Sequence, residues 1–217
     1  AIKSVFKGNV DFISYDVNKL DAKSLIEKAV PMIGKKGKSA VLVISFEEVA
    51  EIINAIPGNS PLLDIQWFGC EGTGNVNRLI ADREFTDKAT RIRFIGASFS
   101  HSGRYKTSLP YALSASINAG FRPLSGYGIN IYDAFSLLTE ALSGLGPSAS
   151  GADLWNLLKR INYFGGIGGP FELDGNSDRT TGFFRFYSIF GKENKYQWNL
   201  IADYENTFSV RGVLTTY

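Results

Sequence analysis

The chain has 217 residues, which is enough for one large domain or two smaller lobes with their own cores. Its 44% hydrophobic and 20% charged residues are typical of a globular protein. A formal net charge of +2 argues against nucleic acid as the main partner, since phosphates require a basic surface, and no apolar run approaches the ~18 residues of a membrane span.

The first 98 residues alternate between helix and strand patterns. Residues 1–7 resemble the end of a helix, Val10–Tyr15 is a predicted strand, and Asp21 can cap the helix that follows. The continuous apolar run Ala40–Ser45 is typical of a buried parallel strand, and apolar residues over 49–56 then recur at helical spacing.

The alternation continues with strands over 64–69 and 91–97, separated by a short helix over 75–82. An α-β-α-β-α-β-α-β order predicts an α/β fold with an open parallel sheet and helices on both faces.

The pattern changes at a polar segment, 98–104, which suits a crossover between lobes. A helix is predicted over 108–118 and a second over 126–142, where Ile131, Phe135 and Leu138 follow helical spacing. Farther on, Ser150 and Asp153 resemble a capping box. A glycine-rich turn is predicted over 164–170, and strands are predicted over 182–190, 195–203 and 207–214.

The candidate site is the turn Gly69-Cys70-Glu71-Gly72, at the end of a predicted strand. Ligands of open α/β sheets bind beyond the carboxyl ends of the strands, and glycines allow close approach to the backbone. Glu71 favours a cation such as an ammonium group, whereas the amide end of a helix beginning near Asn75 favours an anion, so a zwitterion suits the pair. A capping role for Glu71 explains the same residue equally well.

Ser45 and Phe46 close the preceding strand, so they are expected beside Gly72 if the two strands are neighbours. Ser45 could donate a hydrogen bond to a ligand and Phe46 could offer an apolar wall, although core packing is an equally good account of Phe46. Tyr127 begins the long helix, where core packing is the favoured account.

Other chemistries have weaker support. Glycines 69, 72 and 74 lie between a strand and a helix, but their order differs from the dinucleotide fingerprint, and Glu71 would repel a pyrophosphate. The sequence has a single histidine, His101, and a single cysteine, Cys70, which disfavours a catalytic triad, a zinc site or an internal disulfide. We therefore predict no catalytic residue, no metal and no cofactor.

Four stretches in order carry a family resemblance: Ala40–Asn54, Trp67–Gly72 with its G-x-E-G, Pro123–Phe135 with its Tyr-Asp-Ala, and Phe164–Arg179 with its glycines and final Asp-Arg. Together they resemble the branched-chain amino-acid-binding group of type 1 periplasmic binding proteins. The resemblance covers roughly residues 1–190.

The resemblance implies a non-catalytic, two-lobed binder that closes on a small solute such as an amino acid and delivers it to the permease of an ABC importer. It places Glu71 on the ligand ammonium, Ser45, Phe46 and Gly72 along the pocket, and Tyr127 as a wall. It also implies an extracytoplasmic location, periplasmic or at the cell surface, with a lipid anchor in the precursor left open. The alternative with the same fold is the ligand-sensing domain of a receptor or regulator, and a third is an α/β enzyme with a nucleotide loop at 69–74.

The resemblance also implies an incomplete two-lobe architecture. Residues 1–102 and 183–217 correspond to the second lobe, and 103–182 to the return segment of the first. No stretch matches the Ser/Thr-rich loop that holds the ligand carboxylate in that family. No signal peptide is visible in the sequence and its first residue is Ala1 instead of Met, so we expect a processed or truncated product. We expect exposed edges of such a fragment to favour pairing with another copy.

Overall fold

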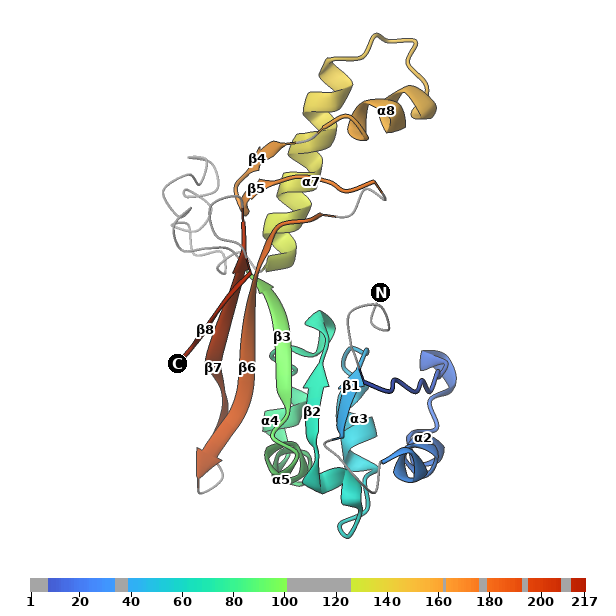
Figure 1. Cartoon of the computed structure of the whole chain (residues 1–217), viewed down its shortest axis with the longest axis vertical. Coiled ribbons are helices and arrows are strands. Elements are labelled where there is room, and N and C mark those ends of the chain that lie inside the picture. The colour runs from blue at the N-terminus through green and yellow to red at the C-terminus, as the bar shows by residue number, and fades with distance from the viewer. Residues whose placement is uncertain are drawn as a thin grey trace. The chain divides into compact units, whose positions relative to one another are not determined.

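The computed structural model describes residues 8–33, 39–100, 126–161, 163–175, 179–192, 195–207 and 212–217. It confirms the predicted fold class, an α/β chain with a mostly parallel central sheet and helices (Figure 1). The strand order of the sheet is β1-β2-β3-β6-β7-β8, and β4 and β5 form a separate two-stranded sheet. The chain divides into a first unit, Ala1–Ala97 with Tyr187–Asn199, and a second unit, Ser98–Phe186 with Leu200–Tyr217.

The first unit is built from short helices and parallel strands. Its elements are α2 (Ala22–Ala29), β1 (Ala40–Val43), α3 (Val49–Asn54), β2 (Gln66–Gly69), α4 (Arg78–Ala81), α5 (Arg83–Arg91) and the start of β3 (Ile95–Ser100). Single 3-10 turns cover Val17–Lys19, Val30–Met32, Pro61–Asp64 and Glu71–Thr73. As predicted, Asp21 caps α2 by accepting a hydrogen bond from the backbone of Ser24.

The core of the first unit lies on one side of β1 and β2. These strands run parallel, with Val41 opposite Trp67, and Val43 and Trp67 are buried in one cluster with side chains of α2, α3, α4 and α5. The alternate residues Leu42 and Phe68 point the other way and are exposed, because successive side chains of a strand face opposite sides. No described helix of this unit covers that second face.

Three sequence expectations in this unit were wrong. The run Ala40–Ser45 was expected to be a buried strand, but Leu42 is 49% and Ile44 64% exposed. Val10–Tyr15 is not a strand. A strand needs a hydrogen-bonded neighbour, and among the described strands β1, at the edge of the sheet, pairs with β2 and not with Val10–Tyr15. The strand expected from residue 91 begins at Ile95, because α5 occupies Arg83–Arg91. That helix lacks a large apolar face: its buried residues are Thr86, whose hydroxyl bonds to the carbonyls of Leu79 and Asp82, and Ala89.

The second unit centres on α7 (Gly126–Ser143), which confirms the long predicted helix. Ser150 and Asp153 form the predicted capping box at the start of α8 (Gly151–Leu158). Where a loop was expected, β4 (Phe164–Gly166) and β5 (Gly169–Phe171) instead form an antiparallel hairpin. The remaining strands are β6 (Gly182–Lys192), β7 (Lys195–Asn206) and β8 (Val213–Thr216). The end of β6 and the start of β7 belong to the first unit, which includes Tyr187–Asn199.

Several expectations fall outside the described residues. They are the helix end at 1–7, the helix at 108–118, His101, and residues 208–211 of the third expected C-terminal strand.

A buried carboxylate joins α7 to the β4–β5 hairpin. Asp133 is 2% exposed and accepts hydrogen bonds from the backbone amides of Ile167, at 2.7 Å, and Gly168, at 3.1 Å. Arg179 lies 3.9 Å from the same carboxylate, with its guanidinium 4.4 Å from the centre of the Phe171 ring. Burial raises the pKa of Asp133, and the two amides and Arg179 oppose that rise.

We expect Asp133→Asn to lower the free energy of unfolding by about 1–3 kcal/mol, because an amide group offers one acceptor oxygen where two backbone donors need acceptors. Denaturant unfolding of the purified chain measures this change. Glu140→Gln, a matched change at an exposed position of α7, serves as the control and should leave stability nearly unchanged. Equal stability of the two variants would contradict a structural role for the carboxylate.

Candidate functional site

The turn after β2 is held by its own hydrogen bonds. The amide of Cys70 donates to the carbonyl of Val43 at 3.1 Å, which ties the end of β2 to the end of β1. The buried hydroxyl of Thr73 donates to the carbonyl of Cys70 at 2.7 Å and closes the 3-10 turn. The turn therefore has a fixed shape at the carboxyl ends of two neighbouring parallel strands.

Four of the five predicted site residues lie together at this edge. A Cβ atom added to Gly72 would stand 2.7 Å from the carbonyl oxygen of Ser45 and 2.7 Å from the ring of Phe46. Only glycine allows the two segments to approach this closely. Ser45 and Phe46 thus flank Gly72, with Glu71 half-buried next to it.

The two residues that follow β1 have opposite surroundings. Ser45 is 3% exposed, and within the described part of the chain its hydroxyl makes no hydrogen bond of ordinary geometry. Phe46 is 66% exposed although it is a large apolar side chain, so core packing does not account for it. A buried hydroxyl without a partner and an exposed aromatic ring are both features that a bound molecule would satisfy.

Tyr15 and Glu48 also belong to this edge and were missed by the sequence analysis. The phenol of Tyr15 donates to Glu48 Oε1 at 3.0 Å and lies 3.3 Å from the carbonyl oxygen of Ile44. Burial and the Glu48 carboxylate raise the pKa of Tyr15 to about 12, and the nearby Ser45 hydroxyl partly offsets the shift. The contact joins segments about thirty residues apart, so no local pattern could have revealed it.

Cys70, Glu71 and the helix that follows the turn differ in what they could offer a ligand. The thiol of Cys70 donates to the carbonyl of Ser45 at 3.3 Å and is half-buried. Among the described residues, the Glu71 carboxylate has no ion-pair partner within 4.0 Å. The helix expected near Asn75 begins only at Arg78 and has four residues, too short to favour an anion as we had predicted.

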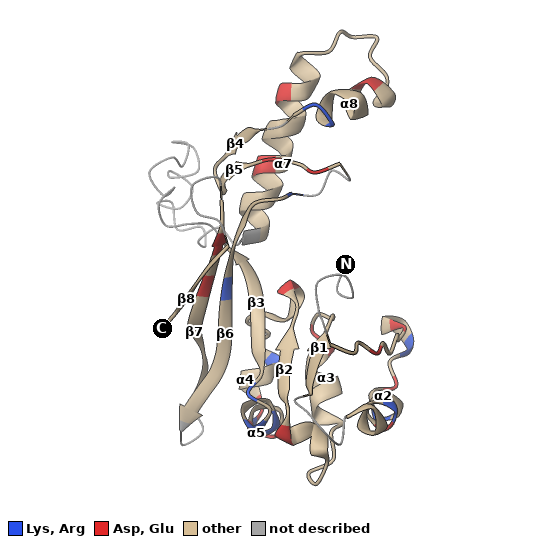
Figure 2. Ribbon diagram, in the orientation of Figure 1, with Lys and Arg blue, Asp and Glu red and all other residues tan. Residues whose placement is uncertain are grey.

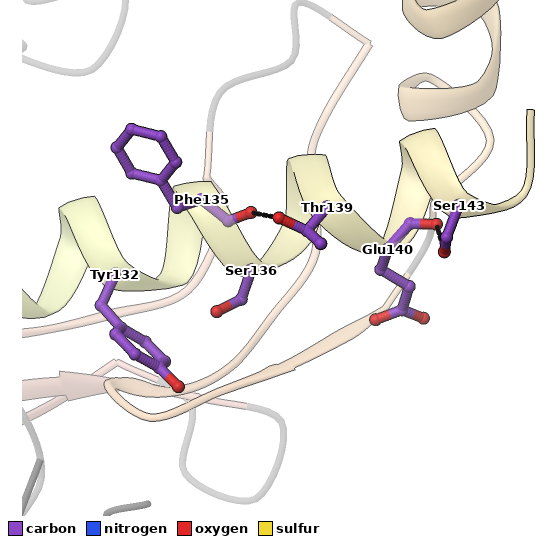
Figure 3. A pocket seen from close by; sticks show the side chains of 6 residues that line it. All are labelled: Tyr132, Phe135, Ser136, Thr139, Glu140 and Ser143. Atoms are coloured by element: carbon purple, nitrogen blue, oxygen red, sulfur yellow. Dashed lines mark hydrogen bonds between the residues drawn. The ribbon is translucent and has the colours of Figure 1, made fainter. Parts of the chain in front are cut away.

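Tyr127 belongs to the second unit, at the start of α7, where its side chain is about half exposed. Farther along α7, Figure 3 shows a shallow surface lined by Tyr132, Phe135, Ser136, Thr139, Glu140 and Ser143. The hydroxyls of Thr139 and Ser143 are already bonded to carbonyls of the same helix, at 2.8 Å each. Because every lining residue comes from one helix, this surface has one wall and does not enclose a ligand.

Two further properties concern the described residues only. They hold no group of three or more His, Cys, Asp or Glu side chains placed to bind a metal ion. Their helices also include none with the length and hydropathy needed to cross a membrane.

Comparison with known proteins identifies a fold but no family. No family model matches the chain. Uncharacterized protein MJ1266 of Methanocaldococcus jannaschii is 26% identical over 211 residues, covering 91% of this chain and 48% of that protein. The chain therefore spans about half the length of this relative.

Among solved structures, a leucine-binding protein, LivK, from Thermotoga maritima matches with a TM-score of 0.56 at 14% identity, over 89% of this chain and 51% of that one. The isoleucine complex of LivJ, a branched-chain amino acid transporter substrate-binding protein from Streptococcus pneumoniae, matches with a TM-score of 0.47 at 20% identity, over 92% of this chain and 54% of that one. The LivK match shows that this chain has the fold of about half of that leucine-binding protein.

We expect Gly72→Ala to lower the free energy of unfolding by about 1–3 kcal/mol, because the new methyl group would meet the backbone of Ser45. Chemical denaturation followed by tryptophan fluorescence measures the loss. Gly58→Ala is the matched control, since a Cβ at Gly58 has no atom within 4 Å. A similar loss of unfolding free energy in both variants would show that the Ser45 backbone does not pack tightly against Gly72.

Removal of the Ser45 hydroxyl should leave stability unchanged or raise it by up to about 1 kcal/mol, because a buried hydroxyl that makes no well-formed hydrogen bond among the described residues costs free energy. Thr73→Val should instead cost about 1 kcal/mol, because the Thr73 hydroxyl is buried and bonded. Thermal unfolding of Ser45→Ala and Thr73→Val makes the comparison. A large loss in Ser45→Ala would mean that the hydroxyl already has a structural partner.

Proposed function

We propose that the chain is part of an extracytoplasmic solute-binding protein of an ABC importer, and that its ligand is an amino acid or a similar small polar solute. The binding site is the carboxyl edge of β1 and β2. In this proposal the permease of the importer is the macromolecular partner, and the chain performs no chemistry.

The buried hydroxyl of Ser45 beside Gly72 is the observation that carries the proposal: among the described residues it makes no hydrogen bond of ordinary geometry, and the Tyr15 phenol lies near it. Sites of open α/β folds lie outside the carboxyl ends of the strands, and this hydroxyl lies at that edge. The exposed ring of Phe46 supplies apolar surface next to it. Polar and apolar groups side by side suit a solute that has both.

Charge favours a ligand with an ammonium group. Glu71 follows Cys70 in the turn, and Glu48, three residues after Ser45 in the sequence, accepts a hydrogen bond from Tyr15. The six described salt bridges place no Lys or Arg on Glu71 or Glu48. An edge with two carboxylates and no such counter-ion attracts a cation, and a dinucleotide pyrophosphate would be repelled. In this proposal Glu71 binds the ammonium.

A titration with amino acids tests the proposal. Backbone amide chemical shifts of the labelled chain report binding even when the dissociation constant is about 1 mM, as expected for a partial site. Leucine, glutamine and lysine should shift the amides of residues 45, 46, 71 and 72. Glucose and a carboxylic acid without an ammonium group should not.

Two variants sharpen the titration. Glu71→Gln should weaken amino-acid binding by about tenfold or more, because the ligand ammonium loses its charged partner. Glu47→Gln, on an exposed neighbour of Phe46, is the matched control and should bind as before. Unchanged affinity in Glu71→Gln would assign Glu71 to capping of the turn, and binding of glucose in preference to every amino acid would contradict the ligand class.

A further inference from the structure

Tyr15 stands next to the group that the proposed ligand has to reach. The Ser45 hydroxyl is buried, and the phenol of Tyr15 lies beside it at the carboxyl edge of β1. The same phenol donates to Glu48 Oε1 at 3.0 Å and lies 3.3 Å from the carbonyl oxygen of Ile44. Because the hydroxyl is buried, a ligand reaches it only if a neighbouring side chain moves, and the phenol is a polar group already in the place that a ligand group would take.

The position of Tyr15 depends on few contacts. The residue belongs to the segment 9–16, which forms neither helix nor strand, so no regular backbone hydrogen bonds fix it. Its side chain is partly buried and packs at the border of the core of the first unit. A phenol has one proton to donate, and the shorter of its two contacts, with the Glu48 carboxylate, takes that proton. A single charge-assisted hydrogen bond therefore holds the phenol in place.

Displacement of the phenol would favour a ligand with an ammonium group. Acidic residues follow both strands, Glu47 and Glu48 after β1 and Glu71 after β2 (Figure 2). When the phenol moves away, the Glu48 carboxylate loses its donor and adds to the attraction that Glu71 exerts on a cation. A ligand shifts an equilibrium only by binding one state better than the other. Contacts with Ser45 and Glu48 that exist only after the phenol has moved supply that difference.

We propose that Tyr15 is a gate of the amino-acid site: without ligand its phenol closes on Ser45 and Glu48, and a bound solute displaces it. The inference rests on the proposed function, since a gate acts only where a ligand binds. The apparent dissociation constant of such a site is the intrinsic constant divided by the fraction of molecules whose gate is open. A change that weakens the closed state therefore tightens ligand binding.

Tyr15→Phe tests the gate, because it keeps the ring and removes the hydrogen bond to Glu48. In the amino-acid titration of the labelled chain, its dissociation constant should be about tenfold lower than that of the unaltered chain, which is the worth of one hydrogen bond to a charged group. At neutral pH the substitution changes no charge, since burial and Glu48 raise the pKa of Tyr15 to about 12.

Tyr196→Phe is the matched control. It removes a bond of the same kind, from the Tyr196 phenol to Asp87 Oδ1 at 3.0 Å, where β7 meets α5. Its affinity should lie within about twofold of that of the unaltered chain. Unchanged or weaker binding by Tyr15→Phe would overturn the gate, because the phenol would then be either out of the ligand's way or a direct contact of the ligand.

A measurement on the ligand-free chain tests the closed state by itself. Backbone amide relaxation should show greater fast motion of residues 13–16 in Tyr15→Phe than in Tyr196→Phe, because the bond to Glu48 no longer holds that segment. Circular dichroism shows whether both variants are folded. Equal motion of the segment in the two variants would overturn the gate alone. Absence of amino-acid binding in the unaltered chain and in both variants would overturn the proposed function and the gate with it.

Discussion

One-sided burial of β1 and β2 is the constraint on which the first unit depends. Val43 and Trp67 hold the strands against four helices, and the indole nitrogen of Trp67 donates to the carbonyl of Leu62 at 2.9 Å, so the ring is fixed in the core. With the strands fixed, their carboxyl ends stop side by side. The carbonyl of Val43 then meets the amide of Cys70, and the candidate site forms where the sheet ends.

The same arrangement leaves Ser45 buried while Phe46 is exposed. A strand alternates its side chains between faces, so the residue after Ile44 turns toward the core side and its neighbour turns away. The absence of a side chain at Gly72 lets the following turn approach the Ser45 carbonyl. Polar and apolar groups are therefore adjacent because of strand geometry and one glycine, without a long loop to position them.

Much of this could be predicted from sequence, and the exceptions have physical causes. Helix α7 was clear because its apolar residues repeat over about three turns, and the cap of α8 because Ser150 and Asp153 stand at the right spacing. Helix α5 was missed because it buries Thr86 and Ala89 instead of large apolar residues. Val10–Tyr15 has a strand-like composition, but pairing with a neighbour decides whether a strand forms, and pairing is not a local property. The contact of Tyr15 with Glu48 was hidden for the same reason, whereas the Gly69–Gly72 turn was recognisable from its glycines.

Cys70 offers a natural position at which a fluorescent dye could be attached to this site. It is the chain's single cysteine, and its half-buried thiol lies against the Ser45 carbonyl, within the turn that contains Gly72. A thiol-directed dye would attach at one position only and would sense the polarity of its surroundings there. The native sequence therefore already contains the labelling site that engineered optical sensors usually have to acquire by mutation.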